Sequence, residues 1–209
     1  MTNRDLTYIG VLVDRSGSME DMRSEMEFAL NAYLKGQAAQ PGPARVTLAQ
    51  FDNAYETVYQ WQPIESVPQY RLEPRNATAL YDALGRLIAE SRATIAHMAE
   101  DERPGTVIIV VITDGYENSS VEHTQGSVKA MITEQQDEHS WQFVFLGANI
   151  DSVKVAGSLG ISADAAMDFV AEAAPMAMER LGAYTASMRS VGHARFSDED
   201  RAVSRGESN

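Results

Sequence analysis

The chain has 209 residues, of which 44% are hydrophobic and 22% are charged, and it carries a formal net charge of −13. This length and composition suit one α/β domain with a substantial buried core. The negative charge argues against nonspecific nucleic-acid binding and against attraction to anionic membranes, and the lack of cysteine excludes disulfides and thiolate metal sites.

The first part of the chain predicts a strand, a helix and a hairpin. Residues 8–13 form a short β-rich run, and apolar residues then recur at helical spacing over 22–33. Two further strands, 44–51 and 56–61, flank a short polar turn, so we expect an antiparallel hairpin. The stretch 63–75 contains three prolines, which indicates an ordered loop without regular structure.

The second part of the chain alternates helices and strands. Thr78 can cap a helix whose apolar positions run from Leu80 to Met98. The run at 106–113 is rich in β-branched residues and unbroken, which is typical of a central strand covered on both faces. The remaining predicted elements are a helix capped near Thr124, a strand at 142–146, a short helix at 153–159, an edge strand at 166–170 and a helix at 175–193.

This order of elements predicts the fold class. Strands that alternate with helices, plus one hairpin, favour a doubly wound α/β fold: a mostly parallel six-stranded sheet with one antiparallel edge strand and helices on both faces. We expect residues 1–195 to form this domain and the polar segment 196–209 to be a disordered tail. In such sheets, binding sites form beyond the carboxyl ends of the strands, where the strand order reverses.

Hard oxygen donors occur at three of the predicted element ends. Asp14, Ser16 and Ser18 share the turn after the first strand, Thr78 precedes a helix, and Asp114 ends the central strand. Carboxylate and hydroxyl oxygens without nitrogen or sulfur suit Mg²⁺, Ca²⁺ or Mn²⁺. Three ligands on one turn are too few for such a cation. We therefore expect the three ligand segments to meet at one edge of the sheet; in chain order, the first carries Asp14, Ser16 and Ser18, the second Thr78 and the third Asp114.

These three pieces together resemble the von Willebrand factor type A (vWA) domain. Asp-x-Ser-x-Ser, a Thr before Ala-Leu, and Thr-Asp-Gly at a strand end form the metal-ion-dependent adhesion site (MIDAS) of that family. The resemblance implies a Rossmann-like fold and a Mg²⁺ ion, with Mn²⁺ or Ca²⁺ as alternatives, held by Ser16, Ser18 and Thr78. Asp14 and Asp114 would contribute directly or through water. One coordination position would stay open for an Asp or Glu of a partner protein.

Three functions remain open at this stage. The resemblance favours a cation-dependent protein-binding module that is not an enzyme and binds neither nucleic acid nor membrane. The alternatives are a metal-assisted phosphohydrolase that uses Asp14, and a scaffold with a purely structural metal site that binds through its last helix and tail. Catalysis is disfavoured because no histidine lies in the three segments and the sequence contains no nucleophile elbow or phosphate loop.

Plainer roles compete for several of these residues. Ser18 and Thr78 could each be an ordinary helix N-cap, and Asp114 with the following glycine could be an ordinary turn. We expect Arg15 to point toward the mouth of the site or into solvent, and Asn118 to be an ordinary loop residue.

The setting of the protein is the last expectation. No signal peptide fits the first residues and no run of about 18 apolar residues is present, which predicts a cytoplasmic protein. A short chain with a single domain of this kind is similar to the bacterial and phage members of the family.

Overall fold

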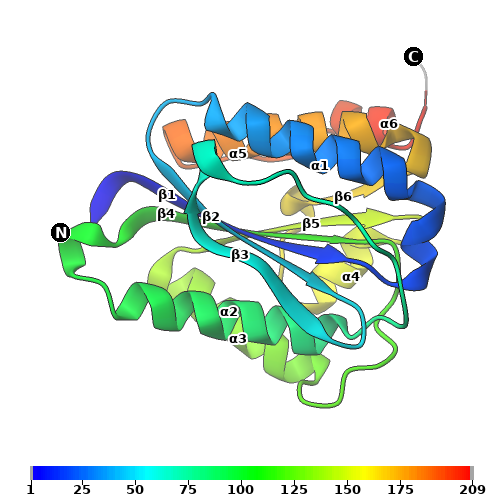
Figure 1. Cartoon of the computed structure of the whole chain (residues 1–209), viewed down its shortest axis with the longest axis horizontal. Coiled ribbons are helices and arrows are strands. Elements are labelled where there is room, and N and C mark those ends of the chain that lie inside the picture. Colours follow the sequence, from blue (N-terminus) through cyan, green and yellow to red (C-terminus); the bar gives the residue numbers. More distant parts are fainter. Residues whose placement is uncertain (1, 208–209) are drawn as a thin grey trace.

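A six-stranded sheet between two layers of helices organises residues 2–207, which the computed structural model describes (Figure 1). The strand order is β3-β2-β1-β4-β5-β6; β3 pairs with β2 in antiparallel fashion, and every other pairing is parallel. The predicted fold class, including the hairpin and the antiparallel edge strand, is therefore confirmed. The strands are β1 Asn3–Asp14, β2 Ala44–Phe51, β3 Tyr55–Pro63, β4 Pro104–Thr113, β5 Gln142–Ala148 and β6 Ala166–Phe169.

Helices cover both faces of this sheet. Figure 1 shows α1, α5 and α6 over one face and α2 and α3 over the other. The helices are α1 Arg23–Ala38, α2 Leu80–Ala96, α3 Gln125–His139, α4 Ser152–Ser158, α5 Ala174–Val191 and α6 Asp198–Ser204. The short 3-10 helices are η1 Gly17–Met22, η2 Ile64–Ser66, η3 Glu100–Glu102, η4 Ala163–Ala165 and η5 Ala171–Ala173. None of the helices within residues 2–207 combines the length and apolarity needed to span a bilayer.

The centre of the sheet consists of β1 and β4. The apolar run of β4 from residue 107 to 112 is buried on both faces, as its unbroken pattern predicts. Gly10 of β1 lies directly opposite Ile109, and a Cβ at Gly10 would come within 2.7 Å of the Ile109 Cδ1 atom. A side chain at position 10 would therefore displace the end of the Ile109 side chain.

The same central pair sets the position of the site. β1 is flanked by β2 on one side and β4 on the other, so the chain order reverses between β1 and β4. Asp14 pairs with Phe51, and Val13 pairs with Ile112. The loops that follow β1, β2 and β4 consequently leave the sheet side by side at its carboxyl edge.

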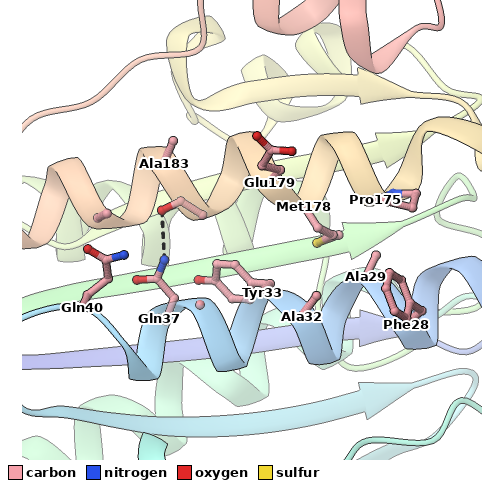
Figure 2. A pocket seen from close by; sticks show the side chains of 13 residues that line it. Phe28, Ala29, Ala32, Tyr33, Gln37, Gln40, Pro175, Met178, Glu179 and Ala183 are labelled. Atoms are coloured by element: carbon pink, nitrogen blue, oxygen red, sulfur yellow. Dashed lines mark hydrogen bonds between the residues drawn. The ribbon is translucent and has the colours of Figure 1, made fainter.

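A groove lies between α1 and α5, which run side by side (Figure 2). Gln37 donates from Nε2 to the Gly182 carbonyl oxygen at 2.9 Å, and the Tyr33 and Thr185 hydroxyls lie 3.1 Å apart. The groove has a volume of about 520 Å³, and none of the five predicted metal ligands lines it. It is therefore separate from the site described below.

The C-terminal segment differs from the expected disordered tail. Residues 198–204 form α6, whose Ser197 and Asp200 make a reciprocal capping box. Phe196 is 2% exposed and packs on Tyr184 with ring centroids 4.8 Å apart. The Phe196 ring, the bond from Arg201 Nη2 to the Ala163 carbonyl oxygen at 2.6 Å and the bond from the Val170 N–H to the Ser204 carbonyl oxygen at 3.0 Å thus anchor a polar segment that composition alone marks as unstructured. Residues 208–209 lie outside the described residues.

Candidate metal centre

Asp14 ties the first ligand segment to the neighbouring strand. Its side chain is 0% exposed; Oδ1 accepts the Ser16 backbone N–H at 2.7 Å, and Oδ2 accepts the Thr113 hydroxyl at 2.6 Å. The turn then continues into η1, and the Ser16 hydroxyl makes no capping hydrogen bond there. The carboxylate therefore fixes both its own turn and the end of β4.

The first and third segments meet through their side-chain oxygens. The Ser18 hydroxyl donates to Asp114 Oδ1 at 2.9 Å, and Ser16 Oγ lies 3.1 Å from Ser18 Oγ and 3.4 Å from the same Asp114 oxygen. An octahedral Mg²⁺ with oxygen ligands at about 2.0–2.1 Å places adjacent oxygens about 3 Å apart. These three oxygens have the spacing of neighbouring ligands, and Ser18 is not an N-cap.

Thr78 reaches the same place from the second segment. The N-cap of α2 is Ala79, without a side-chain capping bond, so the prediction that Thr78 caps this helix is wrong. Thr78 is instead buried beside Gly115: a Cβ at Gly115 would lie 3.2 Å from Thr78 Oγ1 and 4.0 Å from Asp14 Oδ2. The Thr78 hydroxyl and the Asp14 carboxylate therefore flank one glycine.

Asn118 joins the second segment to the third. Its Oδ1 accepts the Thr78 backbone N–H at 3.0 Å, and its own N–H donates to the Thr78 carbonyl oxygen at 3.0 Å. The expectation of an ordinary loop residue is wrong, because this pair of bonds holds Thr78 against the loop that follows β4.

The electrostatics of the site favour a cation. Burial raises the pKa of Asp14 to about 6, although hydrogen bonds from Thr113 and Ser16 oppose the rise. Burial also raises the pKa of Asp114, with a further contribution from the charge of Asp21. Both carboxylates are hydrogen-bonded by hydroxyls or a backbone amide, and a divalent ion beside them would offset the burial that disfavours their charged forms.

The donor set is that of a hard cation. It comprises two carboxylates and three hydroxyls, which suit Mg²⁺, Mn²⁺ or Ca²⁺. Within residues 2–207, no group of three or more His, Cys, Asp or Glu side chains is arranged to hold a metal ion. The hydroxyls of Ser16, Ser18 and Thr78 are thus essential to this candidate centre.

Arg15, between two of the predicted ligands, does not point to solvent. It is 3% exposed; its Nη1 donates to Glu56 Oε2 at 2.7 Å and its Nε lies 3.5 Å from Asp52 Oδ2. The expectation is wrong because the Arg15 backbone N–H bonds the Phe51 carbonyl oxygen at 2.7 Å, which places the residue against the β2–β3 hairpin. Asp52 was missed, although an acidic residue directly after a strand was the signal that identified Asp14.

Comparison with known proteins gives likeness in structure alone. The scan against protein-family models and the search of curated proteins found no match. A von Willebrand factor type A protein from Catenulispora acidiphila superposes with a TM-score of 0.59 at 16% identity, over 87% of this chain and 43% of that chain. Proximal thread matrix protein 1 from the mussel byssus, with a zinc-occupied MIDAS motif, superposes with a TM-score of 0.59 at 14% identity, over 86% of this chain and 46% of that chain.

A third structure extends the comparison. Manganese-loaded TRAP protein from Plasmodium vivax gives a TM-score of 0.51 at 12% identity, over 68% of this chain and 57% of that chain. This chain thus spans about half the length of the proteins that it resembles. At such low identities the likeness establishes the fold only: the chain has the Rossmann-like α/β fold of vWA domains.

Proposed function

We propose that the protein is a divalent-cation-dependent protein-binding module, whose metal ion coordinates an Asp or Glu of a partner. The observation that carries this proposal is the meeting of Ser16, Ser18 and Asp114 oxygens at about the spacing of ligands on one ion. Ser16, Ser18 and Thr78 would be ligands, and Asp14 and Asp114 would contribute directly or through water.

The charge of the donor set supports an open coordination position. Two carboxylates neutralise a divalent ion and the three hydroxyl ligands add no charge, so the metal stays a good acceptor for a third carboxylate. Zinc and manganese are the metals named for the two metal-bearing structures above. For this chain we propose Mg²⁺, because hard oxygen donors and retained waters suit it.

The surroundings of the centre leave room for a partner. Ser18, Glu20 and Asp21 are exposed, and Tyr116, two residues after Asp114, is 59% exposed. The net charge of −13 opposes an acidic partner at long range, but the Debye length of about 8 Å at physiological salt screens distant charges. Direct coordination of the metal ion by the partner's carboxylate therefore decides whether the partner binds.

A thermal unfolding series tests the metal site. Mg²⁺ or Mn²⁺ at about 100 times its Kd should stabilise the protein by about 2.7 kcal/mol over the same protein in EDTA. Asp114→Ala should remove this shift, whereas Asp137→Ala on the exposed face of α3 should keep it. A full shift in Asp114→Ala would refute the ligand assignment.

A second experiment separates binding from the alternatives. Partners captured from the native host should be released by EDTA and should be absent with Asp114→Ala. Partners that persist in EDTA would favour the scaffold, with the groove between α1 and α5 as the surface to examine. Metal-dependent turnover of a phosphoester panel that disappears in Asp14→Ala would favour the hydrolase.

A further inference from the structure

We infer that Asp52 is the positioning residue of the candidate metal centre, which holds the first and second ligand segments against each other. The inference deepens the proposed function and rests on it for its metal-binding readout. Asp52 follows β2 at the carboxyl edge of the sheet and is 0% exposed. Its side chain accepts hydrogen bonds from Arg75 and Asn76, which precede Thr78, and from the Ala54 N–H in its own turn; none of these bonds involves a proposed ligand.

The first step concerns the segment that carries Thr78. Asp52 Oδ2 accepts Arg75 Nε at 2.7 Å and Asn76 Nδ2 at 3.2 Å. The Asp52 backbone carbonyl accepts the Ala79 N–H at 2.8 Å. Asp52 thus makes hydrogen bonds to residues on both sides of Thr78 and so fixes the position of the Thr78 hydroxyl.

The second step concerns the segment that carries Asp14 and Ser16. Arg15 lies between these two residues, and its guanidinium is buried against Asp52. The Arg15 carbonyl oxygen accepts the Arg75 N–H at 2.7 Å, and the Gly17 N–H donates to the Asn76 carbonyl oxygen at 3.1 Å. Two backbone hydrogen bonds therefore join the first ligand segment to the second, directly beside Asp52.

The third step concerns charge. Burial alone would raise the pKa of Asp52, but hydrogen bonds from Arg75, Ala54 and Asn76 and the charge of Arg15 hold that pKa below its usual value. Asp52 is therefore ionised and is the buried counterion of Arg15, whose other acidic partner, Glu56, has a side chain that is 54% exposed. Without the Asp52 charge, the Arg15 guanidinium would keep only a solvent-exposed partner and the two segments would loosen together.

The consequence is a loss of metal affinity. Mg²⁺ demands near-ideal octahedral geometry, and outer groups that orient ligands typically change metal affinity by about 10–100-fold when they are removed. Asp52→Asn, which preserves shape and removes charge, should weaken Mn²⁺ binding by about 10–100-fold by that measure.

The experiment is a Mn²⁺ titration followed by calorimetry on the full chain. The matched control is Asp168→Asn, because Asp168 also tethers a loop at a strand end, accepting the Ser152 N–H at 2.7 Å, but contacts neither ligand segment. The control should bind Mn²⁺ like the unsubstituted protein. An Asp52→Asn variant that is folded and binds Mn²⁺ with unchanged affinity would overturn the inference.

A metal-free measurement keeps the two proposals apart. In EDTA, amide hydrogen exchange at Gly17 and Arg75 should accelerate in Asp52→Asn, while the amides of β4 keep their protection. If the unsubstituted protein binds no Mn²⁺, the proposed function fails, and the exchange data alone decide the role of Asp52. Unchanged exchange at both amides would refute it.

A milder variant guards against loss of folding. Arg75→Ala removes one partner of Asp52 from a side chain that is 53% exposed. It should accelerate exchange at Gly17 and weaken Mn²⁺ binding in the same direction, by less than Asp52→Asn. Native-like protection and affinity in this variant, alongside an unfolded Asp52→Asn, would show that Asp52 acts on global folding only.

Discussion

Replacing Asp14 with asparagine should stabilise the protein when no metal is present and abolish its response to metal. The carboxylate is fully buried, and burial raises its pKa from 3.8 to about 6. At pH 8 without metal it is therefore an ionised group in a place that disfavours charge. Asparagine has nearly the same shape, can accept the Ser16 N–H, and can donate to the Thr113 hydroxyl oxygen.

The magnitude follows from the pKa shift. About two pKa units correspond to about 3 kcal/mol of unfolding free energy at a pH above both values. Imperfect replacement of the hydrogen bonds reduces the gain, so we expect Asp14→Asn to be more stable by about 1–3 kcal/mol in EDTA at pH 8. This corresponds to a rise in Tm of about 2–4 °C per kcal/mol for a chain of this size.

The assay is chemical and thermal unfolding in EDTA between pH 4 and 8. Because the folded pKa of Asp14 is raised, its contribution to stability is present below about pH 4 and is lost as the pH rises through about 6. The two proteins should thus be similar at pH 4 and diverge by pH 8. Asp137→Asn, on an exposed position of α3, controls for the change in net charge.

Two results would refute the reasoning. The first is an Asp14→Asn variant that is less stable than the unsubstituted protein in EDTA at pH 8. The second is a difference in stability that does not change between pH 4 and 8, because a constant difference would have no link to ionisation of the carboxylate.

Three further outcomes follow from the site and its surroundings. Mg²⁺ affinity should fall as the pH drops below about 6, where protons compete for Asp14; calorimetry at several pH values measures this, and constant affinity would contradict it. Gly115→Ala should weaken Mn²⁺ binding and spare the fold, since its Cβ would lie 3.2 Å from Thr78 Oγ1; titration together with circular dichroism checks both. Phe196→Ala should lower the free energy of unfolding by about 3 kcal/mol, whereas a tail without structure would tolerate it without effect.

Local patterns in the sequence were enough to predict the sheet. The unbroken apolar run in β4 and the turn between β2 and β3 indicated a central strand and a hairpin, and both are present. Such patterns succeed because burial on two faces and tight turns each require a characteristic residue composition within a few positions. The same reasoning placed Asp14 and Asp114 at one edge, since both lie at the carboxyl ends of parallel strands.

Side-chain direction was decided only by tertiary contacts. Thr78 has the sequence context of an N-cap, yet its hydroxyl lies beside Gly115 because Asn118 and Asp52 hold the backbone around it. Arg15 looks like a surface residue, yet the buried Asp52 carboxylate pairs with it. These partners lie tens of residues away, so no local pattern reports them.

What the amino-acid sequence determined by itself is therefore the order of the elements and the chemical type of the donors. The folded chain decided which donors face one another and which buried charges hold them there. The physical reason is that periodicity and turn chemistry act between near neighbours, whereas ion pairing and burial depend on contacts that exist only after the sheet has formed.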